Sequence, residues 1–139
     1  MFMQLQKTIS IKALLFLCVG TIGFIVDAAV LWILIFEFDW GHYISRVASF
    51  LVAVPCTWFL NRRLTFSEAA TTNRTREYSI YLLIQSAGAA LNFAIYSACI
   101  FFSSLMFDFP VVALAIGSVT AMLFNFVALQ RYAFTGGRD

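Results

Sequence analysis

The sequence predicts an all-α membrane protein with four transmembrane helices, arranged as two tandem helical hairpins. Of its 139 residues, 62% are hydrophobic and only 12% are charged, whereas an ordinary soluble domain is roughly 45–50% apolar. A soluble domain of this size has too little interior to bury so many apolar side chains. The charged residues also divide the chain into long apolar stretches and gather on one side of them, which fixes the expected topology.

Each predicted helix is a stretch between charged residues that approaches the roughly 20 apolar residues needed to cross a bilayer. The second stretch is the weakest, because only 15 residues, 47–61, separate Arg46 from Arg62. We therefore place Arg46 inside the outer end of the second helix. The predicted helices cover residues 13–36, 43–61, 78–103 and 109–130, and residues 62–77 form the predicted middle loop of a single domain, 1–139.

The basic residues predict the orientation, because they accumulate on the cytoplasmic side of a membrane protein. Eight of the nine lie before the first helix, in the middle loop or after the fourth helix, and the ninth is Arg46. Both termini and the middle loop are thus expected in the cytoplasm. The formal net charge of +2 then records topology, and no nucleic-acid partner is expected.

The sequence contains few residues that carry chemistry on their own. Its three cysteines all lie in predicted helices without a CxxC or histidine pairing, so neither a disulfide framework nor a zinc site is predicted. There is one histidine and no HExxH, GxSxG or glycine-rich phosphate loop. We expect no enzyme, no metal and no cofactor. The apolar N-terminal run contains an acidic residue and lacks a clear cleavage site, so we interpret it as the first helix and not as a signal peptide.

The two predicted hairpins resemble each other. At an offset of 65 residues, Phe16, Gly23 and Asp27 match Tyr81, Gly88 and Asn92. At an offset of 68, the matched pairs are Ser49 with Gly117, Ala53 with Ala121, Thr57 with Asn125, Arg63 with Arg131 and Phe66 with Phe134. A parallel internal duplication is the favoured interpretation, with chance similarity between apolar segments as the alternative.

Asp27 is the most informative single residue, because an acidic group near the middle of a membrane helix costs about 2.5–3.5 kcal/mol on insertion scales. Gly20 and Gly23 share its helical face and allow a neighbouring helix to approach closely. Arg46 is the favoured compensating cation, and Arg62 or Arg63 are less favoured. The carboxylate is either a cation, proton or head-group site, or a structural lock between helices.

The third and fourth predicted helices each carry a polar stripe, and the two stripes could line a shared polar cavity. Gln85 and Asn92 share one face of the third, and Asn125 lies in the fourth. Together with Asp27 and Arg46 they are the predicted intramembrane polar site. The alternative is tight packing alone, because small and amide side chains commonly join membrane helices.

The cytoplasmic ends of the second and fourth helices combine arginine with aromatic residues. Guanidinium groups bind phosphate oxygens through paired hydrogen bonds, which suits an anionic lipid phosphate. The alternative is ordinary positive-inside topology with an aromatic belt, which needs no ligand. The predicted lipid-phosphate contacts are Asn61, Arg62, Arg63 and Arg131.

Three stretches carry a family resemblance: FLCVGTIGFIVDAAVLWIL, SFLVAVPCTWFLNRRLTF and LFNFVALQRYAF. They resemble the GtrA-like family of small four-helix membrane proteins, most specifically through Phe16, Gly20 and Asp27 and through the N-R-x-x-x-F ending of the second helix. The second copy of that ending has Leu129 and Gln130 in place of Asn61 and Arg62.

The resemblance implies a multi-pass protein of the bacterial cytoplasmic membrane that flips a polyprenyl-phosphate-linked sugar, such as undecaprenyl-phosphate-glucose. Such lipids serve the glycosylation of O antigen, teichoic acid and other cell-surface polysaccharides. The alternative implied role is a non-transporting scaffold for a membrane glycosyltransferase. Four helices enclose little volume, so a homo-oligomer is expected. A small proton-coupled exporter is a third possibility, supported only by the intramembrane acid.

Overall fold

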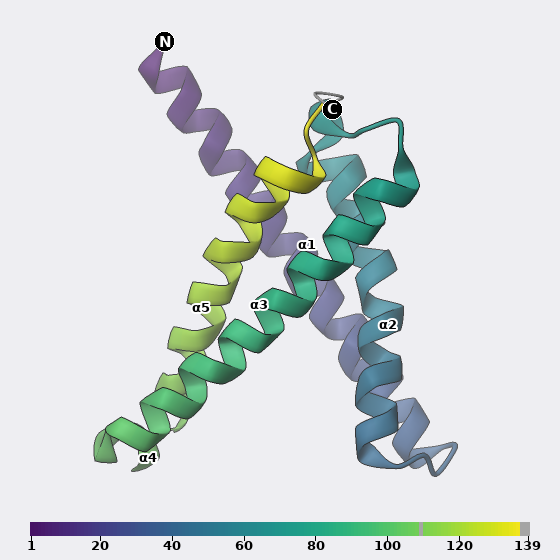
Figure 1. Cartoon of the computed structure of the whole chain (residues 1–139), viewed down its shortest axis with the longest axis vertical. Coiled ribbons are helices and arrows are strands. Elements are labelled where there is room, and N and C mark those ends of the chain that lie inside the picture. Colours follow the sequence, from purple (N-terminus) through teal and green to yellow (C-terminus); the bar gives the residue numbers. More distant parts are fainter. Residues whose placement is uncertain (109, 137–139) are drawn as a thin grey trace. The chain divides into compact units, whose positions relative to one another are not determined.

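The computed structural model describes residues 1–108 and 110–136, and all regular secondary structure in this part of the chain is helical (Figure 1). The chain forms two compact units: Met1–Thr72, to which Gly136 also belongs, and Asn73–Thr135. Unit 1 contains α1 (Phe2–Phe36), α2 (His42–Leu60), the π-helical turn η1 (Asn61–Thr65) and the 3₁₀ turn η2 (Ser67–Ala69). Unit 2 contains α3 (Arg74–Phe102), α4 (Ser104–Asp108), α5 (Pro110–Ala128) and the π-helical turn η3 (Leu129–Ala133).

The first three predicted spans coincide with long apolar helices. Within the described residues, Phe2–Phe36, Ile44–Thr65 and Arg74–Phe102 are long and apolar enough to cross a membrane. The fourth predicted span, 109–130, corresponds to α5. Residue 109, the first of that predicted span, lies outside the described residues. Its crossing of the membrane therefore stays a prediction.

Two predicted boundaries differ from the structure. The first helix begins at Phe2 and not near residue 13, because residues 2–12 contain no proline or glycine to stop it. Its 35 residues extend about 52 Å at 1.5 Å per residue, beyond the roughly 30 Å hydrocarbon core. The segment 62–77, expected as a loop, is instead mostly helical. It contains most of the π-helical turn η1, the 3₁₀ turn η2 and the start of α3 at Arg74. The Asn73 side chain caps α3 by accepting a hydrogen bond from the Arg76 N–H.

Unit 1 is built on close packing of α1 against α2 and η1. Phe16 and Phe66 are both buried and meet edge-to-face, with ring centroids 6.4 Å apart. Further along α1, Gly23 lies so close to Thr57 that a Cβ at this glycine would be 2.3 Å from the Thr57 Cγ2 atom. The glycine therefore permits the helices to approach each other.

Unit 2 repeats these contacts with the residues that the two sequence offsets predict. Tyr81 and Phe134 take the places of the Phe16–Phe66 pair, with centroids 6.2 Å apart. A Cβ at Gly88 would lie 2.2 Å from the Asn125 Oδ1 atom, which matches the glycine–threonine contact of unit 1. Both units also end their last long helix in a five-residue π-helical turn. These matching features at fixed offsets favour duplication over chance similarity.

The π-helical turns are closed by equivalent backbone hydrogen bonds. The Phe66 N–H donates to the Asn61 carbonyl oxygen at 2.8 Å, and the Phe134 N–H donates to the Leu129 carbonyl oxygen at 2.9 Å. Each bond directs a buried aromatic ring back onto its unit. Outside these cores, large apolar side chains such as Phe24, which is 72% exposed, cover the helices and suit a lipid surrounding.

Candidate functional site

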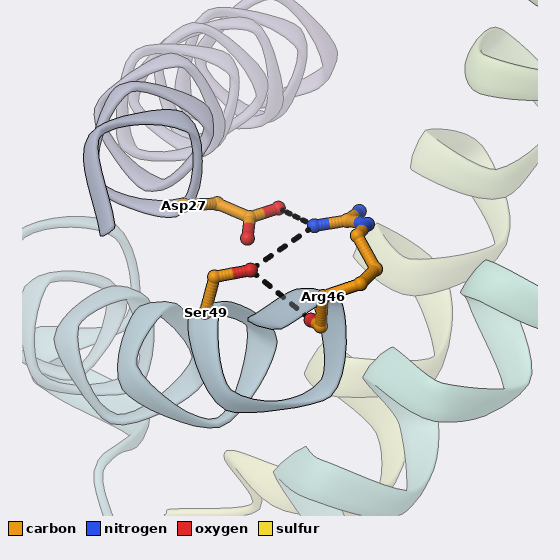
Figure 2. Close-up of polar contacts among 3 residues, drawn as sticks. All are labelled: Asp27, Arg46 and Ser49. Carbon is orange, nitrogen blue, oxygen red and sulfur yellow. Dashed lines mark hydrogen bonds and ion pairs between the residues drawn. The ribbon is translucent and has the colours of Figure 1, made fainter. Parts of the chain in front are cut away.

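Asp27 and Arg46 form an ion pair between α1 and α2 (Figure 2). The Arg46 Nη1 atom donates to Asp27 Oδ2 and also lies 3.5 Å from Ser49 Oγ. The Ser49 hydroxyl donates to the Arg46 carbonyl oxygen at 3.0 Å. Arg46, the cation favoured from the sequence, thus reaches the Asp27 carboxylate, and Ser49 supports it one turn further along α2.

The two charged groups are buried to different extents. The Asp27 side chain is 17% exposed, whereas the Arg46 side chain is 57% exposed. The second carboxylate oxygen, Asp27 Oδ1, is buried and has no hydrogen-bond partner among the described residues. The site therefore retains an unused acceptor inside unit 1 and a guanidinium group that is open to the surroundings.

We expect loss of the Asp27–Arg46 ion pair to lower the stability of the protein measurably. Arg46→Gln leaves the Asp27 carboxylate without its cation, and removal of one partner of a buried pair typically costs about 3–5 kcal/mol. Because Arg46 is more than half exposed, a loss of about 1–3 kcal/mol is expected, between the ranges for exposed and buried pairs. The double variant Asp27→Asn/Arg46→Gln should unfold at a higher temperature than Arg46→Gln alone, measured by thermal unfolding in detergent. If Arg46→Gln and the double variant unfold at the same temperature, the unpaired Asp27 carboxylate carries no penalty of its own, which would contradict this prediction.

The polar residues of unit 2 form two separate contacts. The Asn125 Nδ2 group donates to Gln85 Oε1 at 3.1 Å, and the Asn92 Nδ2 group donates to Ser118 Oγ at 3.4 Å. The Asn125 Oδ1 atom is buried without a hydrogen-bond partner among the described residues. Asn92 matches Asp27 in the repeat, but Leu114 occupies the sequence position that matches Arg46. This position is therefore uncharged in unit 2.

The arginines at the helix ends differ in their surroundings. Arg62 donates to the Thr71 carbonyl oxygen at 2.8 Å and lies 6.0 Å from the Trp58 ring centroid. Arg63 and Arg131 are exposed, and each lies over an aromatic ring of its own unit, Phe59 at 5.1 Å and Tyr132 at 5.7 Å. Such stacking orients a guanidinium group while its N–H groups stay available.

Asn61 has a structural contact within its turn. Its side chain is buried at 2% exposure, and its Oδ1 atom accepts a hydrogen bond of 2.9 Å from the Thr65 hydroxyl. Leu129 and Ala133, both fully buried, take the corresponding places in unit 2. Among the predicted phosphate contacts, Arg63 and Arg131 are therefore the residues whose side chains are exposed and accessible to a ligand.

Sequence reasoning missed one buried charge. Glu77 is 0% exposed and lies in the first turn of α3, where the helix dipole favours an acidic side chain. In the sequence, Glu77 marks only the boundary of an apolar stretch. Its position four residues after the capping Asn73 was the available signal.

Other chemistry is sparse in the described part of the chain. Cys18, Cys56 and Cys99 are free thiols. Within residues 1–108 and 110–136, no group of three histidine, cysteine, aspartate or glutamate side chains is placed to hold a metal ion. The polar sites are therefore the ion pair of unit 1, the amide contacts of unit 2 and the arginines of the helix ends.

This arrangement of apolar helices around a few polar groups occurs in a chain that matches a known protein family. The family model described as GtrA/DPMS, transmembrane domain, matches residues 15–134. The chain belongs to the GtrA/DPMS transmembrane domain family. The resemblance drawn from the sequence motifs is thereby confirmed. The search of curated proteins finds no match.

Family membership and the apolar helices together make the chain a multi-pass membrane protein. The match spans both units, from Leu15 to Phe134, and so includes both aromatic pairs and both π-helical turns. The GtrA/DPMS domain is associated with non-catalytic membrane proteins.

Proposed function

We propose that this GtrA/DPMS protein moves a polyprenyl-phosphate-linked sugar across the bacterial cytoplasmic membrane. The observation that carries the proposal is the Asp27–Arg46 pair within a membrane-crossing hairpin. Ionisable residues inside a membrane are costly and are commonly retained for function. In the proposed topology all four long helices cross the membrane, with both termini and the π-helical turns on the cytoplasmic side.

The exposed arginine of each π-helical turn would contact a lipid phosphate at the cytoplasmic surface. Arg63 and Arg131 are exposed and held over aromatic rings, and guanidinium groups bind phosphate oxygens in a paired geometry. Arg62 supports this end of unit 1 through its bond to Thr71. The polyprenyl tail would stay in lipid throughout.

In each unit by itself, the polar groups of the helices would receive sugar hydroxyl groups. A sugar presents hydroxyl donors, and the buried Asp27 Oδ1 and Asn125 Oδ1 atoms are acceptors without partners in the described structure. An unsatisfied buried acceptor costs about 1–3 kcal/mol, which a hydroxyl donor would recover. A homo-oligomer is the proposed assembly, because two helical hairpins enclose little space for a hexosyl phosphate.

The lipid-binding step is tested by native mass spectrometry of the protein purified with its lipids. Loss of two charge-assisted hydrogen bonds worth about 1.5–3 kcal/mol each should lower retention of glycosylated polyprenyl phosphate by more than about a hundredfold in Arg63→Ala/Arg131→Ala. The matched control Lys7→Ala/Arg74→Ala removes two exposed cations outside the proposed site and should keep the lipid. Equal lipid retention by both double variants would contradict phosphate binding at the π-helical turns.

The alternative function is a non-transporting scaffold for a membrane glycosyltransferase, recruited through residues 62–76. One observation favours it: the beginning of α1, which lines a cavity together with residues of the segment 64–68, carries exposed apolar side chains, including Phe2, Leu5 and Ile9. Under this alternative, a glycosyltransferase co-purifies and only bulk phospholipid is retained. The same mass spectra therefore separate the two functions.

A further inference from the structure

Unit 1 contains a cavity of about 200 Å³ that is separate from the Asp27–Arg46 pair and that the proposed function does not use. Its walls come from the beginning of α1 and from η1 and η2. The residues that matter for its chemistry are Thr8, Lys12 and Leu15 on one side and Leu64, Thr65 and Glu68 on the other.

The cavity carries one charge of each sign. Lys12 and Glu68 both line it, and within the described part of the chain neither forms an ion pair. A ligand that fits this pair of charges carries an anionic and a cationic group itself. The apolar stretch of α1 begins directly after Lys12, so the cavity lies where a membrane-crossing segment meets the lipid head groups.

Of the three residues that bring a hydroxyl group to the cavity, Thr8, Thr65 and Ser67, the two threonines can only accept hydrogen bonds. Thr8 donates its hydroxyl hydrogen to the Gln4 carbonyl oxygen at 2.9 Å, and Thr65 donates its own to Asn61 Oδ1 at 2.9 Å. A hydroxyl group has a single hydrogen and two lone pairs. With the Glu68 carboxylate, both threonines therefore favour a cation that donates hydrogen bonds, which a primary ammonium does and a quaternary ammonium does not.

Apolar residues complete the lining. Leu15 continues along α1 into the apolar stretch, and Leu64 is 50% exposed on η1. A free polar metabolite gains nothing from these side chains, whereas the glycerol and first acyl carbons of a lipid bury apolar surface against them.

We propose that this cavity binds a phospholipid whose head group joins a phosphate to a primary ammonium, as in phosphatidylethanolamine. Lys12 pairs with the phosphate, and Glu68 with the threonine hydroxyls accepts from the ammonium. The bound lipid fills the space between α1 and η1 and so links lipid composition to the π-helical turn.

The test uses the full chain in nanodiscs that contain equimolar phosphatidylethanolamine and phosphatidylcholine with identical acyl chains, followed by release into detergent and native mass spectrometry. We expect the unmodified protein to retain at least fivefold more of the primary-amine lipid. Glu68→Gln should abolish this preference, and Thr8→Val should reduce it. Lys12→Gln should lower retention of both lipids, because both contain the phosphate.

Thr21→Val is the matched control, because Thr21 makes the same bond to the carbonyl four residues earlier, at 3.0 Å, and does not line the cavity. It should keep the full preference. Equal retention of the two lipids by the unmodified protein would overturn the proposal, as would a preference that survives Glu68→Gln and Thr8→Val. Displacement by glycerophosphoethanolamine as readily as by the intact lipid would overturn the assignment to a lipid. None of these outcomes bears on polyprenyl-phosphate binding at the arginines.

Discussion

Gly117→Ala is expected to lower the stability of unit 2 by about 1–3 kcal/mol, the usual cost of inserting a group into a filled interior. A Cβ at this position would lie 2.9 Å from the Asn92 carbonyl oxygen and 2.5 Å from its Oδ1 atom. The side-chain amide can rotate away, but the carbonyl oxygen belongs to the backbone of α3. Helices α3 and α5 must therefore separate, which lowers the midpoint of thermal unfolding in detergent.

Gly20→Ala provides the matched control. It makes the same substitution inside a long helix, but a Cβ at Gly20 has no heavy atom within 4 Å. Its unfolding midpoint should equal that of the unmodified protein or exceed it slightly, since alanine is the better helix former. If both variants unfold at the same temperature, α3 and α5 do not pack as closely at Gly117 as the structure indicates.

Asp27→Asn is expected to reduce transport of a polyprenyl-phosphate-linked sugar at least tenfold. The substitution preserves the side-chain size but removes the charge that pairs with Arg46, and one lost charge-assisted interaction of about 1.5–3 kcal/mol corresponds to tenfold or more. The measurement is the transfer rate of a short-chain substrate in proteoliposomes. Glu37→Gln, an exposed carboxyl group at the end of α1, is the control that should retain full activity.

One further variant, taken together with Asp27→Asn, decides whether the proposed residues are needed for transport. Arg62→Ala removes the side chain that holds the Thr71 carbonyl oxygen and should also slow transport. Full activity in both Asp27→Asn and Arg62→Ala would contradict the proposed site. Loss of activity in Glu37→Gln as well would instead indicate a general sensitivity to charge.

Hydropathy was sufficient to predict α1, α2 and α3, because long apolar stretches in lipid have little alternative to the helix. It failed at residues 2–12 and 62–77, where the chain is polar enough to leave the membrane but remains largely helical. The π-helical turns were unpredictable from local sequence. They depend on Phe66 and Phe134 packing against Phe16 and Tyr81, which lie about 50 residues away in the chain.

The candidate site could be predicted where an unpaired charge in an apolar helix would be energetically costly. The carboxylate of Asp27 had to find a cation, and Arg46 was the cation nearest in the expected topology. The contact between Gln85 and Asn125 was less directly predictable, because it rested only on two polar stripes that could line one cavity. Asn92 bonds to Ser118, which no pattern singled out, because a serine in a membrane helix can satisfy its own hydrogen-bonding needs and leaves no signal in the sequence.

Reconstitution of the purified protein in vesicles allows transfer of short-chain polyprenyl-phosphate-glucose between the leaflets to be measured. Transfer faster than in protein-free vesicles, and slowed at least tenfold by Asp27→Asn, is the predicted result. Transfer no faster than in protein-free vesicles, from protein that co-purifies with a glycosyltransferase, would contradict the account and establish the scaffold in its place.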